Sequence, residues 1–270
     1  MHASVMYHVS PITATLLRSE PLKCCSCGRR HLLAASSSLI SFPSTPTDVI
    51  EKIHARRPDW YEEFFARAMD QDMRSYEAQI SGYKAKLFPH LIENSKHVLE
   101  LGVGTGPNFK YYARADKDLN VIGVDPNKKM EKYARKAAAA AGLSPAGFSF
   151  IQGVGEALPA ADNSMDAVIG TIVLCSVEDV YQSLREVKRV LKPGGLYLFI
   201  EHVAAPDGTL LRLAQTALDP LQQLLSDGCH LTRETGKQIS EAGFSNLILN
   251  MTFLSNVSLI SPHVYGIAFK

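Results

Sequence analysis

The chain has 270 residues, a formal net charge of +1, and 46% hydrophobic and 20% charged residues, which is ordinary for a soluble globular protein. The low net charge argues against a nucleic-acid partner held by charge alone, and the lack of an apolar run of about 18 residues argues against a transmembrane helix. Of the five cysteines, three lie within residues 1–46, and the pattern predicts neither a disulfide framework nor a metal site.

Residues 1–46 differ in composition from the rest of the chain. They are rich in Ser and Thr and carry several basic residues against a single acid, Glu20. This composition is typical of a disordered organelle transit peptide, and its serine content favours a chloroplast over a mitochondrion. Arg29-Arg30, before the apolar stretch of residues 32–40, leaves a twin-arginine lumenal signal as one alternative. An unstructured tail without a targeting role is the other.

Residues 47–93 are predicted to form helices. Asp48 and Glu51 have the spacing of a capping box, and a second helix is expected over Tyr76–Leu87. Apolar residues recur at helical spacing between these points, either as core or as the inner face of a lid over a cofactor, with Tyr76 and Tyr83 as further lid candidates. The recurring residues are Trp60, Phe64, Phe65, Met69 and Met73.

Residues 94–270 alternate between apolar strands and helices. This alternation predicts an α/β fold with a parallel sheet covered by helices on both faces, and such sheets bind ligands at the carboxyl ends of their strands. The expected strands are His97–Leu101, Asn120–Val124, Phe148–Gln152, Asp166–Thr171 and Leu196–Glu201, and the expected helices are Asn108–Ala113, Asn127–Ala141 and Asp179–Leu191.

Three glycines at alternate positions, Gly102, Gly104 and Gly106, follow the first of these strands. Because glycine lacks a Cβ and tolerates positive φ, such a loop can pass close to a nucleotide-like cofactor, although a tight turn between a strand and a helix would use the same residues. A dinucleotide fingerprint would place glycine where Pro107 stands. With Glu100 before it, the loop resembles the glycine loop of the class I S-adenosylmethionine (SAM) methyltransferases.

Asp125 closes the second predicted strand, about 20 residues after the glycine loop. An acid at this place can accept hydrogen bonds from both ribose hydroxyls of an adenosine. Because Pro126-Asn127 follows, the same side chain could instead cap the next helix. We favour the ribose role because the acid and the glycine loop occur together.

Longer strings in the second half of the chain point to a narrower family. They are LCSV at residues 174–177, EHVAA at 201–205, DGC-x-LTRE at 227–234 and PHVYG at 262–266. Through them, residues 90–270 are similar to the methyltransferase-like thiol S-methyltransferases of animals. The resemblance implies a Rossmann-like, doubly wound, mostly parallel seven-stranded sheet, SAM as cofactor, and methyl transfer to a small acceptor, an alkyl thiol in the best-known relatives. Those relatives carry an apolar N-terminal membrane anchor, where this chain has its polar leader.

Residues 153–159 resemble, more distantly, the G-D-A-E-x-L-P segment of the ubiquinone/menaquinone-type methyltransferases. Val154 stands where those proteins have an Asp that bonds the adenine amino group, which leaves the backbone of Val154 and Gly155 to define the edge of the base. Glu156 is either a site residue or a local helix-capping acid. The residues expected to bind the cofactor are Glu100, Gly102, Gly104, Gly106, Asn108, Asp125, Val154, Gly155, Glu156 and Thr171.

Direct transfer from a sulfonium requires an aligned nucleophile and, for a thiol, a nearby base. His202, at the end of the fifth predicted strand, is the first candidate for this base, and a structural role is its alternative. Asp219 and Asp227 are further candidates, with His230. Either aspartate could instead hold the segment of residues 208–230, which is expected to cover the acceptor.

Two cysteines and an arginine near these residues receive structural roles. Cys175 and Cys229 are expected to be wall residues, because the transfer needs no covalent enzyme intermediate. Arg233 is expected to pair with Glu234 or Asp227.

The sequence therefore predicts a chloroplast-targeted, SAM-dependent methyltransferase with a small, rather apolar acceptor, and a thiol is the first candidate. The alternatives are C- or O-methylation of a quinone-like or phenolic plastid metabolite, and a SAM-fold protein that binds without catalysis. No nucleic-acid partner is expected. Peripheral contact with a membrane or lipid droplet, the oligomeric state and the cleavage site of the leader stay open.

Overall fold

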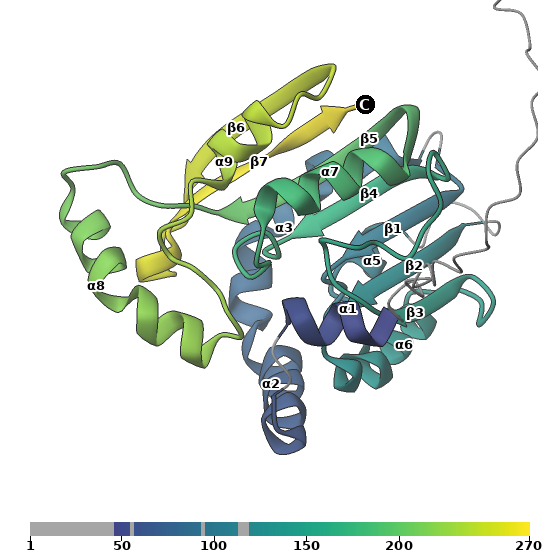
Figure 1. Ribbon diagram of the computed structural model, residues 1–270, viewed down its shortest axis with the longest axis horizontal. Helices are drawn as coiled ribbons and strands as arrows, with labels where there is room; N and C mark the ends of the chain where they lie inside the picture. Colours follow the sequence, from purple (N-terminus) through teal and green to yellow (C-terminus); the bar gives the residue numbers. More distant parts are fainter. Residues whose placement is uncertain (1–45, 55–56, 93–94, 113–118) are drawn as a thin grey trace, which may run out of the picture. The chain divides into compact units, whose positions relative to one another are not determined.

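A computed structural model describes residues 46–54, 57–92, 95–112 and 119–270 (Figure 1). The predicted transit peptide lies outside these residues, apart from residue 46. The helices are α1 (Pro46–Ile53), α2 (Asp59–Asp72), α3 (Arg74–Leu87), α4 (Pro89–Ile92), α5 (Phe109–Tyr112), η1 (Lys128–Met130), α6 (Glu131–Ala140), α7 (Val180–Val190), α8 (Leu210–Leu225), α9 (Thr235–Glu241) and η2 (Ser258–Ile260). The strands are β1 (His97–Leu101), β2 (Asn120–Asp125), β3 (Phe148–Gln152), β4 (Met165–Thr171), β5 (Leu191–His202), β6 (Asn246–Phe253) and β7 (Pro262–Phe269).

The strands form one seven-stranded sheet in the order β3-β2-β1-β4-β5-β7-β6. All pairs from β3 to β5 are parallel, and β7 runs antiparallel to both of its neighbours, β5 and β6. The prediction of a doubly wound, mostly parallel sheet is confirmed. In such an order the chain reverses its direction of travel between β1 and β4, which opens a crevice at the carboxyl ends of these strands.

Both faces of the central strands β1, β4 and β5 are buried, which explains why these strands are almost continuously apolar. Leu99 and Leu101 of β1 belong to a core cluster with α7 and α9, whereas Val98 belongs to a second cluster with α4, α5 and α6. Figure 1 shows α7 and α9 together on one face of the sheet. Successive side chains of a strand point to opposite faces, so β1 anchors both helical layers.

Several element boundaries differ from the predictions, and three of these differences change the local interpretation. Helix α1 already begins at Pro46, so the Asp48–Glu51 pair does not stand at a helix start. The helix expected from Asn127 is divided into η1 and α6, and Asn127 caps η1 by accepting from Lys129 N at 2.9 Å. Strand β5 begins at Leu191 instead of Leu196, because the last residue of the chain pairs with the glycine turn: Gly194 N donates to Lys270 O at 3.2 Å.

Helix α3 is fastened to the antiparallel end of the sheet by its tyrosines. Tyr76 Oη lies 2.6 Å from His263 Nε2 of β7, and Tyr83 Oη lies 2.8 Å from Thr252 Oγ1 of β6. These contacts make both tyrosines packing residues of α3. Among the described helices, none is long and apolar enough to cross a membrane.

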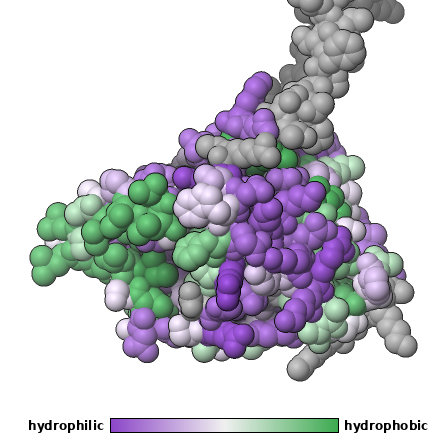
Figure 2. Space-filling model, turned by 90° about the horizontal axis from the view of Figure 1, so that it is seen from below, coloured by the Kyte–Doolittle hydropathy of each residue, from purple (hydrophilic) through white to green (hydrophobic). Residues whose placement is uncertain are grey.

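Helix α8 exposes an apolar face. At 3.6 residues per turn, the spacing of its exposed leucines places them on one side of the helix. Figure 2 shows apolar side chains gathered at the end of the described unit where Figure 1 places α8. The exposed leucines are Leu210, Leu213, Leu218, Leu221, Leu224 and Leu225.

Candidate active site

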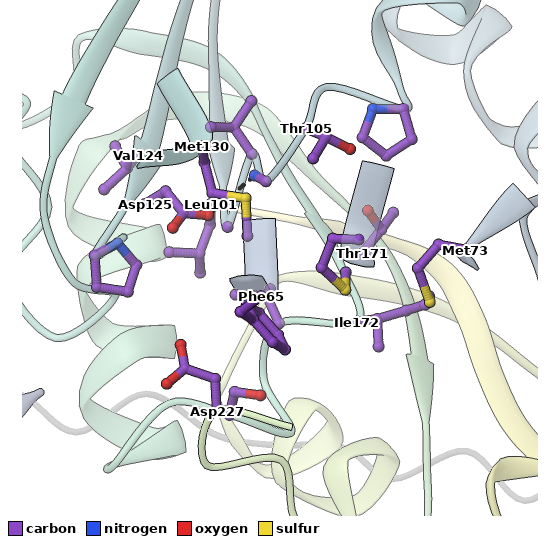
Figure 3. A pocket seen from close by; sticks show the side chains of 18 of the residues that line it. Phe65, Met73, Leu101, Thr105, Val124, Asp125, Met130, Thr171, Ile172 and Asp227 are labelled. Atoms are coloured by element: carbon purple, nitrogen blue, oxygen red, sulfur yellow. Dashed lines mark hydrogen bonds between the residues drawn. The ribbon is translucent and has the colours of Figure 1, made fainter. Parts of the chain in front are cut away.

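A cavity of about 1160 Å³ lies at the carboxyl ends of β1, β2 and β4 (Figure 3). Leu101, Asp125 and Thr171, the last residues of these strands, all line it. Residues of α2 and α3 and the loop after α8 form the other walls. The cavity therefore occupies the edge of the sheet at which the sequence predicted a ligand.

The glycine loop passes along this cavity with positive φ at each of its three glycines. A Cβ on Gly106 would lie 2.5 Å from the ring of Phe109, so this glycine permits the loop to pack on α5. A Cβ on Gly104, where φ is +51°, would have no neighbour closer than Gly102 O at 4.0 Å, so it would project into open space. Gly104 is thus the point at which a ligand can approach the bare backbone.

Asp125 lines the cavity next to this loop, as Figure 3 shows. Its Oδ2 accepts from Gly104 N at 3.0 Å and its Oδ1 from Asn127 N at 2.9 Å. Burial raises the pKa of the carboxyl to about 7, and the two backbone donors oppose that shift. The helix-capping role that the sequence left open for Asp125 falls to Asn127.

Glu100 and Asn108 are buried behind the loop and are not among the cavity-lining residues. Asn108 Nδ2 donates to Glu100 Oε1 at 2.8 Å and to Thr171 Oγ1 at 2.9 Å, which joins β1, the end of the glycine loop and β4. Of these three residues, only Thr171 faces the cavity. Glu100 and Asn108 therefore shape the loop from behind.

Val154, Gly155 and Glu156 all line the cavity. Glu156 Oε1 accepts from Glu178 N at 2.7 Å and from Asp179 N at 3.0 Å. This carboxylate holds the backbone at the start of α7, which is the local role that the sequence gave as its alternative.

The three candidate catalytic residues are placed differently. His202 is buried, its Nε2 lies 3.1 Å from Cys229 Sγ, and it does not line the cavity. Asp219 also lies outside the lining, where it accepts from Leu231 N at 2.5 Å and so holds the loop after α8. Of the three, the structure brings only Asp227 to the cavity. The strand-end argument failed for His202 because the cavity lies over β1, β2 and β4, and β5 is the next strand outward.

Asp227 has φ of +48° and sits at the turn that follows α8. Its Oδ2 lies 3.7 Å from His54 Nε2, and its Oδ1 lies 3.6 Å from Arg57 Nε. No hydrogen bond reaches Oδ1 from the described residues. In the view of Figure 3, Asp227 lies at the opposite end of the cavity from Thr105 of the glycine loop.

A further set of lining residues comes from the N-terminal helices. Phe65, Met69 and Met73 line the cavity, whereas Trp60 and Phe64 of the same stripe are exposed. The helical spacing indicated a common face for the first three, but it could not show that this face covers a cavity. Arg57 also lines the cavity, and the sequence carried no signal for it.

Two charged side chains, the buried Glu201 and the half-buried Arg233, hold the segment of residues 172–174, of which Ile172 and Val173 line the cavity. Glu201 accepts from Val173 N and Leu174 N at 3.1–3.2 Å, and burial raises the pKa of this carboxyl to about 7. Arg233 Nη1 donates to Leu174 O at 2.6 Å. Arg233 therefore holds this wall and does not pair with Glu234 as expected, since Glu234 lies near Arg212 (3.6 Å). Cys175 and Cys229 lie behind the wall and not in it.

Known proteins resemble this chain in sequence and in fold. Residues 99–199 match the family described as a methyltransferase domain. The chain is 41% identical over 202 residues to the thiol S-methyltransferase TMT1A of Homo sapiens, which covers 72% of this chain and 81% of that protein. It is 36% identical over 118 residues to a ubiquinone/menaquinone biosynthesis C-methyltransferase of Bartonella quintana, with 43% and 45% covered. A solved structure of a SAM-dependent methyltransferase from Thermotoga maritima superposes with a TM-score of 0.55 at 21% identity, covering 78% of this chain and 99% of that one.

The chain belongs to the methyltransferase family of TMT1A. It is a SAM-dependent enzyme, as the sequence predicted, so the alternative of a binding protein without catalysis is set aside. The cavity of this methyltransferase suits its cofactor, because a volume of about 1160 Å³ exceeds the roughly 300–1,000 Å³ of common ligand sites and leaves room for an acceptor. The bare backbone at Gly104 and the carboxylate of Asp125 could hold SAM at the strand ends.

Proposed function

We propose that this methyltransferase methylates the sulfur of a small, rather apolar thiol. The observation that carries the proposal is one continuous cavity with two kinds of wall. One part consists of the backbone of the glycine loop and the carboxylate of Asp125. The other part is lined by the apolar side chains of Phe65, Met69 and Met73. The relatives at about 41% identity, which are named thiol S-methyltransferases, support a thiol as the acceptor.

The chain's residues divide the work between two ends of the cavity. Asp125 and Gly104 hold the cofactor, which supplies an activated methyl group on its sulfonium. The apolar residues of α2 orient the acceptor and exclude water, and α2 with α3 acts as the predicted lid. Positioning of this kind can lower a barrier by several kcal/mol, roughly 7–11 in favourable cases.

A thiol must lose its proton to become a good nucleophile, and its free pKa is near 8.5. Asp227 and His230 both line the cavity and offer acceptors for that proton. Asp227 Oδ1 is buried, lies 3.6 Å from Arg57 Nε and receives no hydrogen bond from the described residues, so a ligand that enters the cavity would give it a hydrogen-bond donor. We assign Asp227 as the residue that orients the thiol hydrogen.

The test is an acceptor screen with the full chain, SAM and acceptors of similar size: an alkyl thiol, a phenol and a quinol. Mass spectrometry should find the methylated thiol, with equimolar S-adenosylhomocysteine. Asp227→Asn should lower kcat about 100- to 10,000-fold, the effect of losing one general base, without a change in SAM affinity. The exposed Asp207→Asn is the matched control and should leave both unchanged. Methylation of the quinol or phenol alone would replace the thiol proposal by its alternative.

Targeting of residues 1–46 to the chloroplast stays a proposal from composition. It affects where the acceptor is found and not how the cavity binds it.

A further inference from the structure

Two cysteines and a histidine from distant parts of the chain meet behind the part of the cavity wall that contains Ile172, Val173 and Ser176. Cys175 follows β4, His202 ends β5, and Cys229 follows α8. One donor atom from each lies within 4.8 Å of the other two, and His202 Nε2 lies 3.1 Å from Cys229 Sγ. All three residues are buried, and both cysteines are free thiols.

We propose that Cys175, His202 and Cys229 bind a zinc ion. In tetrahedral zinc sites, Zn–S bonds of about 2.3 Å and Zn–N bonds of about 2.0–2.1 Å place neighbouring donors roughly 3.5–3.8 Å apart. The present spacing, from 3.1 Å up to 4.8 Å, brackets that range, so small side-chain movements bring the three donors into three of the four tetrahedral positions and leave the fourth to a water molecule. Two thiolates and an imidazole also form a donor set that zinc prefers over harder cations.

Charge balance favours the ion in this buried place. Binding releases one proton from each thiol to solvent, and the two thiolates then neutralise the +2 charge of zinc. The net charge brought into the interior is zero, which avoids the penalty of an unpaired buried ion.

The hydrogen bonding of His202 leaves Nε2 free to bind a metal. Among the described residues, the one hydrogen-bond partner of Nε2 is the sulfur of Cys229, and a thiol is a weak partner. A metal ion would give this buried nitrogen a much stronger partner. Nδ1, which is buried and has no partner among the described residues, would stay on the side away from the ion.

The location gives the ion a positioning role. The neighbours of Cys175 and Cys229 in sequence, Ser176 and His230, line the cavity, and His230 N donates to Cys175 O at 2.9 Å. Zinc would therefore fix the loop after β4 to the loop after α8 from behind. This inference does not depend on the identity of the acceptor.

The experiment uses the full chain with Cys24, Cys25 and Cys27 replaced by serine, so that the leader thiols cannot bind metal. After reduction, chelation and reloading with zinc alone, elemental analysis should find one zinc per chain, and loading with Co²⁺ should give a thiolate-to-cobalt charge-transfer band. Both signals should persist in His263→Gln, a matched control for a buried histidine outside the donor set.

The variants Cys229→Ser and His202→Gln should lose the stoichiometric zinc and the charge-transfer band. A parent chain that binds no zinc and gives no such band would overturn the proposal even if these variants do not fold. A reduced-buffer mass two hydrogens below the thiol form, showing a Cys175–Cys229 disulfide, would also overturn it. Zinc retained in both variants would do the same.

Discussion

Asp125 combines burial, two backbone donors and a place at the cavity wall, so its ionisation should control cofactor binding. We expect Asp125→Asn to weaken SAM binding about 10- to 100-fold, because hydrogen bonds to a charged group contribute about 1.5–3 kcal/mol. The amide also turns one acceptor oxygen into a donor that faces Gly104 N or Asn127 N. Calorimetry measures the dissociation constant, with Asp207→Asn as the control. An unchanged constant in a folded variant would remove Asp125 from the site.

The pH dependence of SAM binding follows from the same carboxyl. With a pKa raised to about 7, Asp125 is largely protonated at pH 6 and ionised at pH 8. Only the ionised form accepts hydrogen bonds with both oxygens, so affinity should rise with pH through about 7 and then level off. Asp125→Asn should abolish this slope, which separates it from the titration of other groups.

Gly104 and Gly106 both have positive φ, so an alanine at either position meets the same backbone strain. Their surroundings differ, and a comparison of the two alanine variants therefore isolates the effect of the added Cβ. A left-handed backbone costs an alanine roughly 1–2 kcal/mol at either position. Gly106→Ala should lose more stability than this, because its Cβ would lie 2.5 Å from Phe109. Gly104→Ala should mainly weaken SAM binding, since its Cβ would enter the cavity. Chemical denaturation measures the stability of the two variants, and calorimetry measures their affinity for SAM. If both variants lost the same affinity and had the same stability, the placement of Gly104 at the cavity and of Gly106 against Phe109 would be contradicted.

At the scale of elements, the sequence predicted strands better than helix ends. The predicted bounds of β1 and β3 are those of the structure, because strands buried on both faces carry a continuous apolar signal. The start of β5 was wrong because its first residues pair with Met165 and Lys270, which are remote in sequence. Local patterns do not contain such contacts.

Within the site too, features that depend on local spacing were predictable, and features that depend on contacts between distant segments were not. The glycine loop and Asp125 were predictable because their spacing is local and their strand ends adjoin the cavity. His202 also ends a strand, but β5 lies outside the cavity, and only the sheet order reveals this. The segment of residues 208–230 was expected to cover the acceptor, whereas only the last turn of α8, at Gln223 and Leu224, and the loop that follows it reach the cavity.

At the scale of the whole molecule, the exposed leucine face of α8 reaches the cavity at its C-terminal end, where Leu224 is both exposed and part of the cavity lining. Tyr61 Oη lies 3.4 Å from Leu225 O, so the start of α2, with exposed Trp60 and Phe64, lies beside the end of α8. A surface of this kind suits the interface of a lipid layer, from which an apolar acceptor could enter the cavity.

We therefore expect the full chain to float with vesicles of neutral phospholipid and to resist release by salt, because its net charge is only +1. Leu213→Glu with Leu221→Glu should abolish flotation, since each exposed leucine that enters the lipid contributes up to about 1.5–3 kcal/mol. Ile248→Glu with Met251→Glu, two exposed apolar residues of the edge strand β6, is the matched control and should float like the parent. Equal flotation of both double variants would show that another part of the chain binds the lipid. Loss of thiol methylation only for water-insoluble thiols in the α8 variant would connect the surface to acceptor entry.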